Sequence, residues 1–348
     1  MPPKSKADTA GYQKLKRDLA AGTWDRLYLL HGEETYLRDY YLGQLKAQVL
    51  TGEMEEFNFH EISGKEMSPQ RLEEALDCLP VLSERTLVLV VDFDLFKAGE
   101  KDREEYVHLL SQLPEYCCLV FLYDLIPYKG DARTKLAAML KSSGTVVNFV
   151  RQDQSDLTDW VRRRFKALGK EMDSRLALHF IFLCGDLMTG LIGEIEKISA
   201  YAKGLQITKE DIDAVATPQL DAVVFGMTDA IGQGDFDKAL SVLGELYQMQ
   251  EPAIKIMWSL GRQMRQLYSA KLAQQAGKGA DYLARLWGLK PYPAEKLMSS
   301  ARRFSLSWCR QAVVLCGEAD RDMKSTGQDA KDLLTDLMLR LAAQGEQR

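Results

Sequence analysis

Short apolar runs alternate with amphipathic stretches over the first 150 residues of the chain. Four runs are apolar at nearly every position, as expected of strands buried on both faces of a sheet; they are 27–31, 86–91, 117–123 and 145–150. Between them, apolar residues recur three and four positions apart, which predicts helices at 35–50, 68–79, 104–113 and 134–140. This alternation predicts a parallel α/β domain over residues 23–150.

The helix expected at 68–79 shows its boundaries in the sequence. Ser68 followed by Pro69 is a typical helix start, with a hydroxyl at the N-cap and proline in the first turn. Apolar residues at 72, 75, 76 and 79 mark one face, and Pro80 is expected to end the helix. The polar segment that follows leads to the next strand.

Beyond residue 150 the strand pattern stops and every periodic stretch is helical. Four short stretches predict a small helical domain over 151–217; they are 156–168, 174–183, 188–202 and 208–216. Seven further stretches predict a third, all-helical domain over 218–343; they are 222–233, 236–249, 252–276, 279–287, 292–302, 305–324 and 330–343. The fold class expected is therefore α/β plus all-α.

The N-terminus carries basic residues without an apolar segment after them, so we expect no secretory signal. Residues 1–22 are instead expected to be a flexible tail. No apolar run approaches the roughly 20 residues that a helix needs to cross a bilayer. The sequence therefore predicts a cytoplasmic protein without membrane contact.

Cysteine and histidine are too scattered to predict a metal site. The six cysteines include no C-x-x-C pair, and the four histidines lie far apart in the sequence. Structural zinc needs four such ligands, commonly in close pairs. We expect buried, unreactive thiols and no metal.

The charge is unevenly distributed. The net charge of −5 argues against a protein that coats nucleic acid over its whole surface. Residues 255–310, however, contain eleven Lys or Arg and only two acidic residues. A local basic surface is therefore expected in the third domain.

The loop after the first strand lacks the features that bind nucleotide phosphates. A P-loop needs the pattern G-x-x-x-x-G-K-[ST], in which backbone amides and a lysine surround the phosphates. Here Gly32 is followed by Glu33, Glu34 and Thr35, with no lysine, and the two acids would repel phosphate. Asp92, at the end of the 86–91 strand, resembles a magnesium-binding aspartate, but without a P-loop a structural role is favoured. No cofactor is expected.

Six segments, in order along nearly the whole chain, resemble the bacterial DNA polymerase III delta subunit family. They are 27–42 (LYLLHGEETYLRDYYL), 78–89 (CLPVLSERTLVL), 186–202 (DLMTGLIGEIEKISAYA), 262–267 (RQMRQL), 287–292 (WGLKPY) and 319–341 (ADRDMKSTGQDAKDLLTDLMLRL). The chain departs from the family pattern at His31 and at Met264, where Tyr and Phe are commoner.

This resemblance implies an architecture and a role. The architecture is an AAA+-like α/β domain without a P-loop, a helical lid at 151–217 and a helical collar at 218–343. The role is that of a non-catalytic clamp-loader subunit that binds the sliding clamp and opens it for loading onto primed DNA. The implied partners are the clamp, the loader ATPase subunits and a delta-prime-like subunit.

Two site hypotheses follow. The residues alone favour Val81 and Leu82 as core beneath the sheet edge, whereas the resemblance implies an exposed apolar pair that enters a cleft of the clamp, with Arg85 at its rim. The basic stretch either is a solvated outer face or places four arginines near DNA; these are Arg262, Arg265, Arg302 and Arg303.

Two other functions remain open. The chain could be a divergent AAA+ relative with ATPase activity at a cryptic site, which a nucleotide-binding assay would reveal. It could also be a DNA-binding helical protein that acts alone, which would shift DNA without partners.

Overall fold

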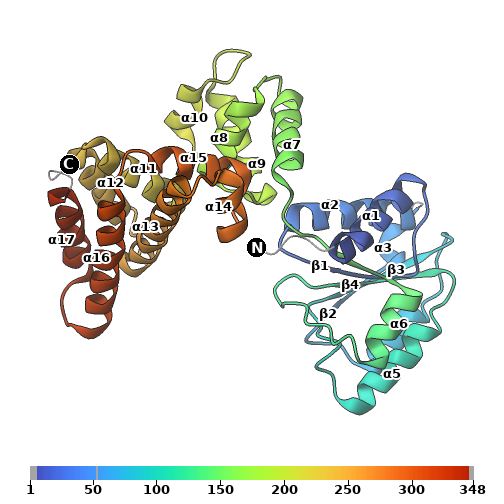
Figure 1. Ribbon diagram of the computed structural model, residues 1–348. Coiled ribbons are helices and arrows are strands. Elements are labelled where there is room, and N and C mark those ends of the chain that lie inside the picture. Colours follow the sequence, from blue (N-terminus) through green and yellow to red (C-terminus); the bar gives the residue numbers. More distant parts are fainter. Residues whose placement is uncertain (1–5, 52–53, 345–348) are drawn as a thin grey trace. The chain divides into compact units, whose positions relative to one another are not determined.

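The computed structural model describes residues 6–51 and 54–344 (Figure 1). The chain folds as two compact units. The first contains the described residues up to Gln152 together with Leu187–Thr189, and the second contains Asp153–Asp186 and the described residues from Gly190 on. The predicted α/β part followed by an all-helical part is confirmed.

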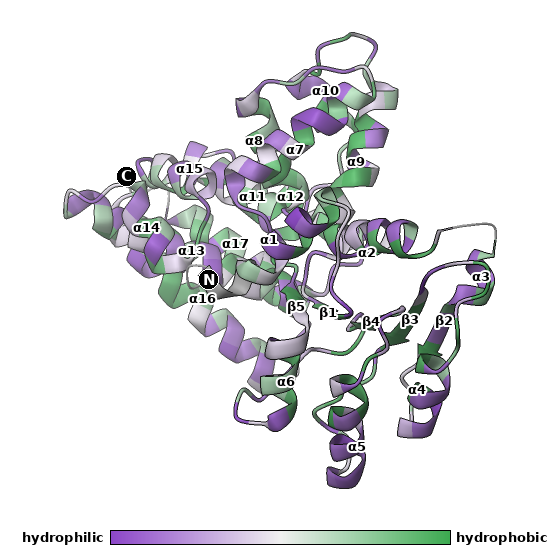
Figure 2. Ribbon diagram, turned by 90° about the vertical axis from the view of Figure 1, so that its right-hand side faces the viewer, coloured by the Kyte–Doolittle hydropathy of each residue, from purple (hydrophilic) through white to green (hydrophobic). Residues whose placement is uncertain are grey.

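The first unit is built on a five-stranded parallel sheet in the order β2-β3-β4-β1-β5. Its strands are β1 (Leu27–His31), β2 (Phe59–Ser63), β3 (Thr86–Val91), β4 (Cys117–Leu122) and β5 (Thr145–Asn148). Four of them are the expected strands, and β2 was not expected. The hydrophobic colouring along β3 and β4 reflects their burial on both faces (Figure 2).

Helices cover both faces of this sheet. They are α1 (Lys6–Ala20), α2 (Thr35–Val49), α3 (Glu55–Asn58), α4 (Pro69–Leu76), α5 (Glu100–Ser111) and α6 (Lys135–Ser143). In Figures 1 and 2, α1 and α2 lie on one face and α4, α5 and α6 on the other. The second group packs on alternate strand residues such as Leu29, Val88 and Phe121.

The expected flexible tail is wrong for the described part of residues 1–22. Residues 1–5 lie outside the described residues, but α1 is a helix whose Leu15 and Leu19 are buried. The helix packs so closely on β5 that a Cβ at Gly11 would lie 1.9 Å from the carbonyl oxygen of Val146. The apolar residues are few, but their spacing of four places them on one face of a helix.

Helix α4 begins as expected but ends early. The Ser68 hydroxyl accepts a hydrogen bond from the backbone N–H of Arg71 at 3.1 Å, which caps the helix. The helix ends at Leu76, four residues before Pro80. Leu79 therefore does not belong to the buried face, and its side chain is exposed.

Within the described residues of the second unit, the only secondary structure besides helices is one isolated β-bridge between Glu171 and Gln206. Its first helices are α7 (Gln154–Ala167), α8 (Ser174–Cys184), α9 (Met188–Tyr201, of which the first two residues group with the first unit) and α10 (Lys209–Val215). These are followed by α11 (Leu220–Gln233), α12 (Phe236–Gln248), α13 (Ala253–Gln275), α14 (Ala280–Trp287), α15 (Pro291–Ala301), α16 (Leu306–Ser325) and α17 (Ala330–Ala343). Thr208 and Asp211 form a capping box at the start of α10.

No single helix among the described residues has the length and hydropathy of a membrane span. Only α8 and α9 taken together reach that threshold, and this pair is bent by 116°.

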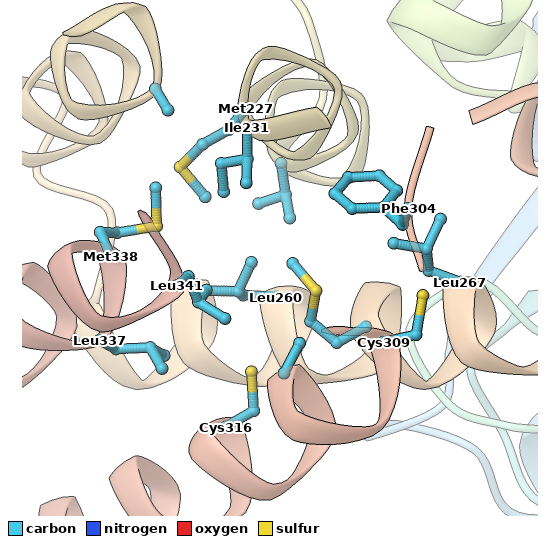
Figure 3. Close-up of a cluster of buried hydrophobic side chains, with 14 of the residues drawn as sticks. Met227, Ile231, Leu260, Leu267, Phe304, Cys309, Cys316, Leu337, Met338 and Leu341 are labelled. Carbon is cyan, nitrogen blue, oxygen red and sulfur yellow. The ribbon is translucent and has the colours of Figure 1, made fainter. Parts of the chain in front are cut away.

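One hydrophobic core joins the helices from α11 to α17. Leu260 of α13 lies near its centre, with Met227 and Ile231 of α11 above it and Leu341 of α17 beside it, and Leu267 of α13 lies next to Phe304 (Figure 3). Cys309 and Cys316 of α16 are also buried in this core. Burial raises the pKa of Cys316 to about 12, so this thiol stays protonated and unreactive at neutral pH.

Candidate protein-binding site

The parallel sheet separates two groups of loops. Every loop that precedes a strand lies at one edge of the sheet, and every loop that follows a strand lies at the opposite edge. The segment 77–85 precedes β3, and α3 precedes the neighbouring strand β2. The loop 32–35, which was compared with a P-loop above, follows β1, and Asp92 follows β3. The two candidate sites therefore lie at opposite edges.

Val81 and Leu82 stand at the surface of the 77–85 segment. Val81 is 45% exposed and Leu82 is 80% exposed. Leu82 also has a φ of 48°, a left-handed conformation that residues other than glycine rarely adopt. A large apolar side chain held outward in an unfavourable backbone conformation is typical of a functional loop. The core interpretation does not fit this placement.

One buried side chain, that of Asn58, holds this loop. Its Oδ1 accepts a hydrogen bond from the N–H of Val81 at 2.7 Å, and its Nδ2 donates to the carbonyl of Val81 at 2.9 Å. Nδ2 also donates to the carbonyl of Met54 at 3.0 Å. Asn58 is the last residue of α3, which lies beside β2 (Figure 2). The role of Asn58 could not be predicted from the sequence, since the contact joins residues 23 positions apart and has no local signal.

The Arg85 side chain contacts two other residues of the first unit. Its Nη1 donates to the carbonyl of Glu115 at 3.0 Å, and its guanidinium lies 5.5 Å from the centre of the Trp24 ring. Both partners lie in segments that precede strands, so they share the edge of the 77–85 loop. Arg85 therefore buttresses the end of this loop while remaining half-exposed.

At the opposite edge, the loop after β1 is occupied by contacts within the protein. The N–H of Glu34 donates to the carbonyl of Phe149 at 2.9 Å. Gly32 has a φ of 128°, and a Cβ there would lie 2.4 Å from the same carbonyl oxygen. The Glu33 carboxylate pairs with Arg151 at 2.7 Å. The loop thus packs on the strand-end backbone instead of surrounding an anion.

Asp92 has a structural role at this edge. Its Oδ1 accepts hydrogen bonds from three successive backbone N–H groups, those of Asp124, Leu125 and Ile126, at 2.8, 2.9 and 3.2 Å. The Asp124 carboxylate pairs with the buried Arg38 at 2.6 Å. One oxygen of the Asp92 carboxylate and one of the Asp124 carboxylate therefore already have partners within the protein. Among the described residues, no group of His, Cys, Asp or Glu could hold a metal ion.

The four arginines expected near DNA come from two segments of the second unit. Arg262 and Arg265 lie on α13, whereas Arg302 and Arg303 follow α15. Arg262 pairs with Asp221 and stacks on Trp258 at 4.9 Å, and Arg303 pairs with Asp229.

A cationic side chain in an aromatic environment lies where α8, α11 and α15 meet. The ammonium of Lys296 lies 4.7, 5.5 and 5.7 Å from the ring centres of Phe182, Phe225 and Tyr292. Burial lowers the pKa of Lys296. Burial also lowers the pKa of the neighbouring His179, whose Nε2 lies 3.2 Å from the Asp213 carboxylate.

Comparison with known proteins agrees with this architecture. The family model of the DNA polymerase III delta subunit matches residues 28–150. The model of the C-terminal domain of the same subunit matches residues 221–341. The two matches together cover more than half of the chain.

Individual relatives match over almost their full length. A Bacillus subtilis (strain 168) protein named DNA polymerase III subunit delta is 27% identical over 333 residues, 93% of this chain and 94% of that protein. An Aquifex aeolicus (strain VF5) protein named probable DNA polymerase III subunit delta is 25% identical over 323 residues, 90% of each chain. The solved structure of a Bacillus subtilis DNA clamp loader delta protein is 23% identical with a TM-score of 0.55, covering 95% of this chain and 99% of that one. The chain belongs to the DNA polymerase III delta subunit family.

Proposed function

We propose that this chain binds the sliding clamp and holds one clamp interface open while the clamp loader places the ring on primed DNA. The observation that carries the proposal is the exposed pair Val81 and Leu82, fixed on its loop by Asn58, in a chain of the delta family. Burying each apolar side chain in a cleft is worth roughly 1.5–3 kcal/mol. Such protruding anchors commonly dominate an interface. Arg85 would contact the rim.

The proposed role is non-catalytic. ATP binding would need free backbone amides, a lysine at the phosphates and a carboxylate for magnesium. The loop after β1 has two glutamates and no lysine, and the Asp92 carboxylate already accepts hydrogen bonds from three backbone N–H groups. These contacts count against the alternative of a divergent ATPase.

The second unit is proposed to supply the lid (151–217) and the collar (218–343). The collar would join the loader ATPase subunits and a delta-prime-like subunit in the cytoplasm. This assignment is supported by the separate core of α11 to α17 and by the C-terminal family match at residues 221–341.

Contact with DNA is proposed only within the assembled complex. Because Arg262 and Arg303 are engaged by Asp221 and Asp229, Arg265 and Arg302 are the better candidates for phosphate contacts. A chain that binds DNA strongly by itself would instead present a continuous basic surface.

Co-purification with the sliding clamp tests the proposal directly. The full chain should form a complex with the purified clamp in the absence of ATP, and adding the loader ATPase subunits should produce a larger assembly. A chain that forms no complex with the clamp, alone or with the ATPase subunits, would refute the proposed role.

A further inference from the structure

We infer that α3 and the 77–85 loop form a single contact surface, in which Asn58 positions Val81 and Leu82 and Phe57 acts as a third apolar anchor. The inference rests on the proposed clamp-binding function and extends it to residues outside the loop. The topology explains the arrangement, because α3 precedes β2, the 77–85 loop precedes β3, and these strands are parallel neighbours.

The buried side-chain amide of Asn58 forms hydrogen bonds with the backbone of the loop. The side chain is only 1% exposed, and both its oxygen and its nitrogen bond to Val81. The two hydrogen bonds between the Asn58 side chain and the Val81 backbone resemble the pair of N–H···O bonds that two opposed residues of antiparallel strands exchange. Neither Asn58 nor Val81 lies in a strand. A loop fixed before binding loses less conformational freedom when the partner arrives, so its affinity is higher.

The conformation of Leu82 requires such a support. A leucine in the left-handed region is strained, and this strain persists only where the surrounding structure fixes the backbone. The bonds from Asn58 to the preceding residue, Val81, supply that constraint. Asn58 is therefore a positioning residue for the exposed pair.

Phe57 extends the apolar surface beyond the loop. It is 62% exposed, although it directly precedes the buried Asn58 in a helix of only four residues. Exposed glutamates lie on both segments; they are Glu55, Glu56 and Glu84. Apolar side chains surrounded by charged residues mark protein interaction sites. The matching partner surface is an apolar cleft with basic side chains where it faces these three glutamates.

The test measures affinity of the full chain for the purified sliding clamp, together with the thermal midpoint of each variant. We expect Phe57→Ala to weaken binding about 10-fold without changing the midpoint, because its side chain is exposed. We expect Asn58→Ala to weaken binding about 5- to 30-fold. The matched control is Leu125→Ala, since Leu125 is 86% exposed at the opposite edge of the same sheet.

A double-mutant cycle separates positioning by Asn58 from a general loss of folding. In a chain that already carries Val81→Ala and Leu82→Ala, Asn58→Ala should cause little further loss of affinity, because the two side chains that Asn58 positions are already truncated. A loss of the same size in both backgrounds would show that Asn58 acts independently of Val81 and Leu82 and would overturn the positioning role.

The remaining outcomes distinguish this inference from the proposed function. If the loop double variant weakens binding while Phe57→Ala or Asn58→Ala binds as the control does, the inference fails and the proposed function stands. If the loop double variant binds like wild type, the proposed function fails first. If sedimentation shows that Phe57 and Leu82 instead hold two copies of this chain together, the assignment to the clamp is wrong.

Discussion

The carboxylate of Asp92 accepts a hydrogen bond from the backbone N–H of Asp124 at 2.8 Å, which joins the ends of the neighbouring strands β3 and β4. Asp92 itself has a φ of 57°, a left-handed conformation that aspartate tolerates better than most residues. In a nucleotide hydrolase an aspartate at this position would face magnesium. Here it organises the backbone of its own protein.

We expect no ATP binding by this chain. The Asp92 carboxylate is occupied, and Glu33 and Glu34 would oppose phosphate at the loop after β1. Calorimetry with ATP and magnesium should give no heat of binding. A dissociation constant in the micromolar range would contradict this expectation.

The structural role of Asp92 can be separated from its charge. Asp92→Ala removes the acceptor of three N–H groups and places alanine in a left-handed conformation, so it should lower the free energy of unfolding by about 2–4 kcal/mol. Asp92→Asn keeps an oxygen acceptor, and asparagine tolerates the left-handed backbone, so it should lower the free energy of unfolding by less than about 1 kcal/mol. Denaturant unfolding of the two variants measures the difference. Equal losses would show that the charge, not the acceptor geometry, matters.

Replacing Val81 and Leu82 together with alanine should weaken clamp binding while leaving the fold intact. A loss of about 1–2 kcal/mol per side chain corresponds to a roughly 30- to 1000-fold lower affinity. Stability should change little, because truncating exposed side chains leaves no cavity. Surface plasmon resonance and a thermal melt on the same variant measure both. A large drop in melting temperature with unchanged affinity per folded molecule would support the core interpretation instead.

A fragment that begins near Thr217 should fold and capture the loader ATPase subunits but not the clamp. The core shared by α11 to α17 lies entirely within this fragment, whereas the Val81–Leu82 pair does not. Circular dichroism and pull-down experiments test this expectation. A folded fragment that captures none of the ATPase subunits would show that the collar assignment is wrong.

Stability should also respond to protonation of His179. Burial lowers the pKa of His179 below its usual value of 6.5, so the unfolded chain takes up a proton that the folded chain resists. The contribution of this residue is therefore present above pH 6.5 and is lost as the pH falls through the folded-state pKa. Asp213, Lys209 and Lys296 also act on this ring.

The comparison of wild type with His179→Gln isolates this effect. The melting temperature of the wild type should fall more between pH 7.5 and pH 5.5 than that of the variant, because glutamine does not titrate. The difference between the two curves removes the contribution of His60, whose pKa burial also lowers. Parallel curves would show that His179 does not titrate with folding.

Elements buried on both faces could be predicted from the sequence, and elements at the margin could not. β3 and β4 are apolar along their whole length and were predicted. β2 is the outermost strand on one side of the sheet, and Ile62 is its one fully buried residue. Its sequence FHEIS therefore has no continuous apolar run. α1 was missed because its many polar residues conceal a narrow face that includes Leu15 and Leu19.

The candidate site shows the same division. The position of Val81 and Leu82 in a connection could be predicted from Pro80 and from the strand that follows. The residues that hold this connection could not be predicted. Asn58, Trp24 and Glu115 come from three distant segments, and only the parallel sheet brings them to one edge. Non-local contacts of this kind leave no period or motif in the sequence.

The parallel sheet has a consequence for how this family can change. The two edges of the sheet are separated by the length of a strand, about 16–20 Å for five or six residues. Substitutions so far apart are expected to act additively. Substitutions at the edge that carries Asp92 are therefore expected to leave the surface at the Val81–Leu82 edge unchanged. Each edge of such a sheet can therefore change in sequence without a structural cost at the other.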